Sequence, residues 1–183
     1  MIPWSSELDL TEFYKTAAQK GFTNNSDRRM LVDCFKNERE SQVWILYYNA
    51  VAIGSVACHS LDILESNAYR ICARTCVFTD MTPIHNITST RGYTIQQHQN
   101  ITAQFFIPAC IEWAGRDKNL YISSNSLDVG SQRLVHKIYC PALEEKRTLE
   151  RAYEKEYRGA VQTFWRLNVE KFYEQLDQLP RWV

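Results

Sequence analysis

The sequence has neither a long apolar run nor an excess of charge of either sign. No apolar segment approaches the ~20 residues that a membrane-spanning helix needs. The chain holds 21 Lys and Arg against 21 Asp and Glu, so its formal net charge is zero. A neutral chain has no broad electrostatic attraction for nucleic acid or for an anionic membrane. We therefore expect no membrane partner, and the charge balance disfavours nucleic acid as a partner.

The sequence also lacks the features of an exported protein. Residues Met1–Glu7 contain no basic segment followed by an apolar one, which is the pattern of a secretory leader. The six cysteines form no Cys-x-x-Cys pair, and a hydrophobic content of 45% supplies a core without disulfides. The four histidines show no metal-ligand spacing beside them. These features predict a cytoplasmic protein with six free thiols and no metal site.

Motifs of several enzyme classes are missing too. The sequence has no Ser/His/Asp arrangement, no phosphate-binding P-loop, no dinucleotide fingerprint and no Glu-rich metal helix. It has no internal repeat, and 183 residues suit one domain. We predict a single domain over residues 1–183. Its parts are N-terminal helices (8–35), a core sheet with a buried helix (42–125) and a C-terminal helix-strand-helix segment (131–183).

What is present in the first half of the chain is a pattern of long strands. Residues 43–48 and 51–58 read as a hairpin around a turn at Asn49-Ala50. A third strand follows over Tyr69–Phe78. Arg70 and Arg74 share one face of it, and we expect that face to be solvated or ion-paired.

Residues 79–99 form a polar loop whose length is typical of functional loops. A helix that is apolar almost all round follows, from about Asn100 to Gly115, so we predict that it is buried. Pro108 lies inside it and should kink it or separate its first turn. We expect the side chains of Phe105, Ile111 and Trp113 to be well buried.

The second half alternates shorter elements. Residues 119–124 read as a strand, 134–139 as a helix and 160–167 as a strand. Asn168 caps a terminal helix. The segment 147–157 fits a helical stripe and a strand face equally well, so the sequence leaves both open.

The order of these elements resembles that of the GNAT-type N-acetyltransferases over about residues 8–168. Residues 44–54 are similar to the family's hairpin, in which the returning strand carries a Gly, here Gly54. Residues 120–125 look like the strand that ends in Asn beside the acyl-carrier cleft. Residues 134–139 look like the helix whose Tyr, in many members, protonates the thiolate of coenzyme A.

The resemblance implies a fold class and a reaction. The fold is α+β, a single-domain GNAT-like fold with a central mixed, mostly antiparallel sheet flanked by helices. The reaction moves an acetyl or related acyl group from a coenzyme A thioester to an amine. Acetyl-CoA would be the donor, and an amine on a small molecule or a protein would be the acceptor.

The resemblance also implies site residues. Three are candidates for catalysis: Tyr139 as the acid that protonates the leaving sulfur, Asp80 as a base at the end of a strand, and Asn125 at the strand end beside the carrier. A second set would bind the carrier, with cationic side chains offsetting phosphate charge. Its members are Cys76, Val77, Phe78, Arg91, Gly92, His98 and Ser124.

Two further functions stay open. Family members usually carry a Gln/Arg-x-x-Gly-x-Gly/Ala loop before the buried helix, whereas Arg91–Ile95 has one Gly. This departure favours a non-catalytic binding or regulatory protein on the same scaffold. A basic cleft around Arg70, Arg74 and Arg91 would suit a GNAT-like enzyme that modifies a nucleic-acid base. The composition also allows a homodimer.

Overall fold

The computed structural model of the chain describes residues 2–3, 38–48, 51–75, 102–130, 132 and 148–177. These residues fall in two compact units. The first unit comprises Met1–Ser60 and Cys72–Thr94, and the second comprises Leu61–Ile71 and Ile95–Val183. The helices predicted within 8–35 and at 134–139 lie outside the described residues.

The first unit contains an antiparallel hairpin. Strand β2 (Ser41–Tyr48) pairs with β3 (Val51–Ser60), with a register shift between Leu46 and Tyr47. The short strand β1 (Ile2–Pro3), which the sequence pattern did not predict, pairs antiparallel with β2. The predicted hairpin is therefore confirmed.

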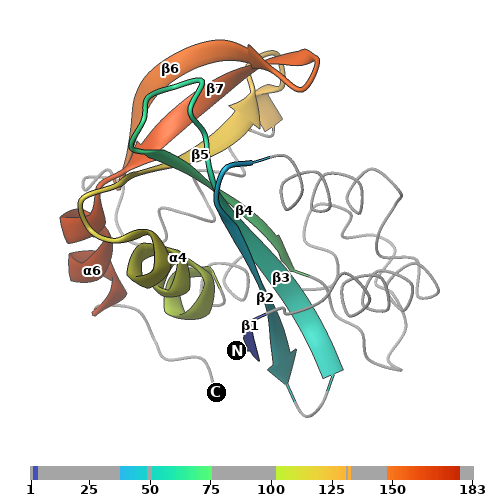
Figure 1. Cartoon of the computed structure of the whole chain (residues 1–183), viewed down its shortest axis with the longest axis vertical. Coiled ribbons are helices and arrows are strands. Elements are labelled where there is room, and N and C mark those ends of the chain that lie inside the picture. Colours follow the sequence, from blue (N-terminus) through green and yellow to red (C-terminus); the bar gives the residue numbers. More distant parts are fainter. Residues whose placement is uncertain are drawn as a thin grey trace. The chain divides into compact units, whose positions relative to one another are not determined.

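The second unit contains strands in the order β4-β5-β7-β6 (Figure 1). Strand β4 (Ala68–Thr75) contributes Ala68–Ile71 to this unit and pairs parallel with β5 (Asn119–Asn125). Strand β7 (Ala160–Leu167) pairs antiparallel with β5 and with β6 (Leu149–Tyr157). One parallel pairing among antiparallel ones makes the sheet mixed and mostly antiparallel, as predicted.

The ambiguous segment 147–157 contains strand β6, and the turn after it gives the reason. Tyr157 pairs with Ala160, so the loop between β6 and β7 is Arg158-Gly159. Both residues have positive φ, 53° and 79°. Two central residues with positive φ make a type I′ turn, whose twist suits a tight hairpin. The hairpin geometry therefore selects the strand over the helix.

The buried helix is divided as Pro108 predicted. A π-helical turn, η1 (Thr102–Phe106), precedes the α-helix α4 (Ile107–Ala114), and Pro108 lies in the first turn of α4. Proline is tolerated there because the first N–H groups of a helix have no partner within it. Gly115 ends the helix at φ 93°, with its N–H donating to the carbonyl of Ile111.

The prediction of which side chains this helix buries was partly wrong. Ile111 is buried, as expected, but Phe105 and Trp113 are only partly buried. Phe106 takes the core position instead and is fully buried. A π turn holds more residues than an α turn, so it shifts which side chain faces the sheet.

The sheet of the second unit packs side chains on both faces. On one face Leu61, Ala68, Tyr121 and Phe164 form a buried cluster, against which Leu64, Tyr153 and Tyr157 pack. On the other face the ring of Tyr69 meets the Trp113 ring of α4 edge to face, with centroids 5.7 Å apart. The last helix, α6 (Val169–Leu176), begins at Asn168, whose Oδ1 accepts from the Lys171 N–H, so the predicted cap is confirmed.

The described residues include three of the six cysteines. Cys58, Cys72 and Cys110 are buried free thiols, as expected for reduced cysteines. Within the same residues no helix is long and apolar enough to cross a membrane, and no group of His, Cys, Asp and Glu is arranged to hold a metal ion.

Candidate functional site

Two of the predicted site residues, Ser124 and Asn125, lie in the described part of the chain, at the end of β5. The others lie outside the described residues: Asp80 and Tyr139 of the catalytic set, and Cys76, Val77, Phe78, Arg91, Gly92 and His98 of the carrier-binding set. The side-chain geometry of the candidate site is therefore that of the β5 end and the groups around it.

Strand β5 has ladders of different extent on its two sides. Its parallel ladder to β4 joins Ala68–Arg70 to Asn119–Tyr121. Its antiparallel ladder to β7 runs from Tyr121 to Asn125. Within the described residues of the second unit, Ile122–Asn125 therefore take part in a ladder on the β7 side alone.

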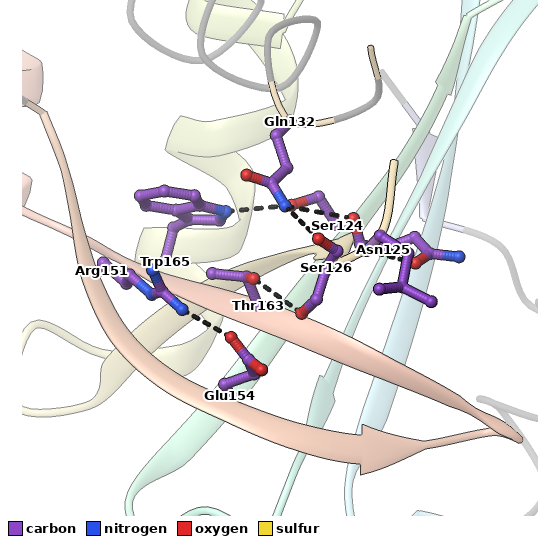
Figure 2. Close-up of polar contacts among 9 residues, drawn as sticks. Ser124, Asn125, Ser126, Gln132, Arg151, Glu154, Thr163 and Trp165 are labelled. Carbon is purple, nitrogen blue, oxygen red and sulfur yellow. Dashed lines mark hydrogen bonds and ion pairs between the residues drawn. The ribbon is translucent and has the colours of Figure 1, made fainter. Parts of the chain in front are cut away.

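Ser124 is fixed by an indole group from β7 (Figure 2). Its side chain is almost fully buried, and its Oγ accepts from Trp165 Nε1 at 3.0 Å. Trp165 pairs with Ile122, two residues before Ser124, so both side chains lie on one face of the sheet. A hydroxyl that accepts a hydrogen bond keeps its own O–H as a donor. Ser124 can therefore donate to a second polar group.

Asn125 has a structural role at the point where β5 ends. Its Oδ1 accepts from the Leu127 N–H at 2.9 Å, which makes an Asx-type turn. Its backbone carbonyl accepts from the Asp128 N–H at 3.1 Å and from Gln132 Nε2 at 3.3 Å. The side-chain amide nitrogen of this exposed residue is the part that remains for a ligand.

Three residues at the β5 end were not among the predicted site residues: Gln132, Thr163 and Trp165. The hydroxyls of Ser126 and Thr163 are 2.8 Å apart, and Gln132 Nε2 donates to the Ser126 carbonyl at 3.0 Å (Figure 2). Cross-strand pairing brings Thr163 and Trp165 to this end, since Ser124 pairs with Thr163 and Ile122 with Trp165, whereas Gln132 is placed by its bonds to the carbonyls of Asn125 and Ser126. That register is not readable from the sequence of either strand alone.

Arg70 is buried, with 6% of its surface exposed, so of the two expected states, solvated or ion-paired, the solvated one is wrong for this side chain. Its Nε donates to Ser123 Oγ at 2.8 Å, and its guanidinium carbon lies 5.4 Å from the centroid of the Tyr157 ring. The cause is the register, because Arg70 pairs with Tyr121 and thus lies on the face that carries the buried cluster. The side chain of Arg74 lies outside those the structure describes.

A carboxylate lies at the other end of β5. Glu65 Oε1 accepts from Asn119 Nδ2 at 2.6 Å and from Tyr121 OH at 2.8 Å, and Oε2 accepts from Tyr153 OH at 3.1 Å. The hydrogen bond from Tyr121 is the largest cause that lowers the pKa of Glu65. Burial, followed by the bond to Glu65, raises the pKa of Tyr121. Lys155 Nζ donates to the Ile63 carbonyl, so the loop at residues 61–67 is held at two points.

The side chains of Ser124, Asn125, Ser126, Gln132, Thr163 and Trp165 at the β5 end are neutral hydroxyls, amides and an indole. Groups of this kind orient a thioester or an amide by hydrogen bonds, and they do not take up a proton at neutral pH. The described part of the site is therefore equipped for binding. Proton transfer would need other residues.

Solved structures match this chain over nearly its full length. A protein from Desulfovibrio desulfuricans assigned to the GNAT acetyltransferases is 12% identical, with a TM-score of 0.55, covering 92% of this chain and 97% of its own. The aminoglycoside acetyltransferase AAC(6')-Ib, crystallised with coenzyme A and kanamycin, is 12% identical, with a TM-score of 0.54 and coverages of 93% and 95%. The fold is that of the GNAT-type N-acetyltransferases.

This GNAT-type fold confirms the predicted α+β class and the resemblance in element order. An uncharacterized protein from Bacillus halodurans also shares it, at 11% identity and a TM-score of 0.57, over 96% of this chain and 86% of its own. No protein-family model matches the sequence, and no curated protein does. At these identities the likeness establishes the fold.

Proposed function

We propose that this GNAT-type protein is an acyltransferase that moves an acetyl or related acyl group from a coenzyme A thioester to an amine. The observation that carries the proposal is the end of β5. There the ladder to β7 continues past the ladder to β4, and the hydroxyl of Ser124 is oriented by Trp165. An acyl carrier with an amide-rich pantetheine arm suits such a strand, because its amides pair with backbone groups as a β-strand does.

Acetyl-CoA is the proposed donor, and the groups present fit the arm that carries its acyl group. Ile122–Asn125 offer backbone N–H and C=O groups, and Ser124 offers a hydroxyl donor. AAC(6')-Ib, which shares the fold, was crystallised with coenzyme A. For the remaining contacts the proposal keeps the candidates from the sequence. Cys76, Val77 and Phe78 would lie along the arm, and Arg91, Gly92 and His98 at the phosphates.

In the proposed reaction a neutral amine attacks the thioester carbonyl carbon directly. The new C–N bond forms, the C–S bond breaks, and the sulfur leaves with the bonding electron pair. Asp80 takes the proton released by the amine, directly or through a water, and Tyr139 gives a proton to the sulfur. Ser124 holds the arm, and the amide nitrogen of Asn125 donates at its rim. The neutral groups of β5 thus bind, and the two titratable residues move protons.

The proposed acceptor is an amine on a small molecule or a protein. AAC(6')-Ib, crystallised with kanamycin, is a protein of this fold that holds an amine-bearing compound. We also propose a cytoplasmic location, where acetyl-CoA is made and where the free thiols Cys58, Cys72 and Cys110 stay reduced. Self-association into a homodimer stays a prediction.

The first test is the melting temperature of the full chain with acetyl-CoA and, separately, with ADP. ADP carries the pyrophosphate charge without the pantetheine arm. At a hundredfold excess over its Kd, acetyl-CoA should stabilise the fold by about 2.7 kcal/mol. For a chain of this size that is a rise of several degrees. An equal shift with ADP, or none with millimolar acetyl-CoA, would refute binding at β5, and the non-catalytic binding protein would then be the better reading.

Two sets of variants then separate binding from chemistry. Ser124→Ala removes the oriented donor and should weaken acetyl-CoA binding, whereas Ser126→Ala, whose hydroxyl bonds Thr163, should not. Arg91→Ala should also weaken binding. Tyr139→Phe should leave binding intact and lower turnover, because it removes a proton donor and little else.

A further inference from the structure

We infer that Arg70 is a positioning residue that braces β5 where its ladder to β4 ends, and that it thereby tunes affinity for the acyl-coenzyme A thioester. The inference rests on the proposed function for its ligand. The resemblance in element order did not indicate a role for Arg70 in ligand binding. We assign Arg70 an indirect role, through its bond to Ser123, and no contact with the ligand.

The first observation is the place of Arg70 in the ladder. Within the described residues of the second unit, the parallel pairing of β4 with β5 ends at the pair Arg70 and Tyr121. Two residues further along β5, and on the same face, lies Ser123. The Nε of Arg70 donates to Ser123 Oγ at 2.8 Å. A side-chain bond thus joins β4 to the β5 residue that lies two positions beyond the last described backbone pair.

The second observation is that Arg70 reaches a further strand. Its guanidinium carbon lies 5.4 Å from the ring centroid of Tyr157 on β6, within the ~6 Å range of a cation–π contact. The Tyr157 ring packs against Phe164 with centroids 6.0 Å apart, and Phe164 pairs with Ser123. Arg70 therefore contacts β5 through Ser123 and β6 through Tyr157, and both of these residues neighbour Phe164 of β7.

The third observation is burial. The Arg70 residue is 6% exposed, and a hydrogen bond from a charged donor is stronger where water is excluded. A buried charge that loses its hydrogen-bond partner is left uncompensated, so breaking the bond from Arg70 to Ser123 Oγ is more costly than breaking one at the surface. The brace is therefore a strong constraint on Ser123.

The link to the ligand follows from strand geometry. Successive residues of β5 point to opposite faces, so a rotation of the backbone at Ser123 also moves Ser124. Ser124 is tied on its own face to Trp165. Arg70 and Trp165 thus hold neighbouring residues of β5 from opposite faces. Together they set the direction of the backbone groups and the hydroxyl proposed to bind the carrier.

The test titrates the full chain with acetyl-CoA by calorimetry. Arg70→Met keeps the bulk of the side chain and removes its donors, and Ser123→Ala removes the acceptor. Loss of a charged hydrogen bond should raise the Kd about tenfold in Arg70→Met and less in Ser123→Ala. Arg70→Lys keeps a charged donor but loses the planar guanidinium over the Tyr157 ring, so it should recover only part of the affinity. Leu61→Ala, in the buried cluster of the same face, is the control for lost stability.

A role in stability alone would give a different result. It would lower the binding stoichiometry, because fewer molecules are folded, and leave the Kd unchanged, as we expect for Leu61→Ala. Amide hydrogen exchange without ligand is the second measurement. Arg70→Met and Ser123→Ala should both speed exchange in a peptide that covers Ile122–Asn125 more than in peptides of β6.

The outcomes keep the two proposals apart. If the wild type binds acetyl-CoA and both Kd and local exchange stay unchanged in Arg70→Met and Ser123→Ala, the brace is refuted and the acyltransferase proposal stands. If the wild type does not bind, the acyltransferase proposal and the tuning of affinity fail together, and the exchange data alone decide whether Arg70 fixes β5.

Discussion

Glu65→Gln should lower the stability of the fold in a way that depends on pH. The Glu65 carboxylate accepts bonds from Asn119, Tyr121 and Tyr153, and in this way it ties the loop at residues 61–67 to β5 and β6. A buried hydrogen bond to a charged group contributes about 1.5–3 kcal/mol. Glu65 is only partly buried, so solvent screens the cluster and we expect a loss of about 1–2 kcal/mol at pH 7.

The sign of the pH dependence follows from the lowered pKa of Glu65, whose ordinary value is 4.5. A carboxylate with a lowered folded-state pKa stabilises the fold above its unfolded pKa, and this contribution is lost as the pH falls through the folded value. The gap in stability between wild type and Glu65→Gln should therefore be full at pH 6–7, taken as about two units above 4.5. It should shrink as the pH falls below 4.5.

Urea denaturation at several pH values measures this gap. Glu154→Gln is the matched control, because Glu154 is an exposed carboxylate paired with Arg151 on the surface of β6. Surface pairs of this kind contribute about 0–1 kcal/mol. An equal loss in both variants, or a gap for Glu65→Gln that stays constant down to acid pH, would show that the three hydrogen bonds do not act as described.

Three further predictions concern the fold. Phe106→Ala should cost about 3–5 kcal/mol, because its side chain is fully buried, and Phe105→Ala clearly less, as urea denaturation can measure. Asn168→Ala should cost about 1 kcal/mol by removing the cap of α6, which a lower melting temperature would report; no change would mean that the cap bond is not formed. Alkylation of the denatured, non-reduced chain should add one label for each of the six cysteines by mass, and a loss of two labels would indicate a disulfide.

The strands and the terminal cap were predictable because their signals are local. Runs rich in apolar and β-branched residues mark β2, β3 and β7, and Asn168 precedes the apolar stripe of α6. The sequence pattern of segment 147–157 did not decide between helix and strand, because its residues fit both the helical period of about 3.6 residues and the strand period of about 2. The decisive residues were Arg158-Gly159, and a type I′ turn with Arg at its first position is an uncommon signal.

The burial of single side chains depends on contacts that no local pattern contains. Arg70 reads as a surface arginine from its strand alone, and its burial comes from pairing with Tyr121 and from rings on β6 and β7. Phe105 and Phe106 are adjacent and equally apolar, and the π turn of η1 selects between them. Tertiary packing decides such cases. The sequence therefore predicts where helices and strands lie better than it predicts which of their side chains are buried.

The arrangement at β5 separates two tasks that a transferase must perform. Ser124, Trp165 and Thr163 are neutral, so their hydrogen bonds change little across the pH range in which a general acid or base titrates. Binding of the carrier should then depend weakly on pH near neutrality. In the proposed reaction, the steps assigned to Asp80 and Tyr139 would carry the pH dependence of turnover. In the proposed reaction, hydrogen bonds at the strand end would also fix the thioester before the amine arrives, and positioning of this kind is a large part of the rate gain in a bimolecular transfer.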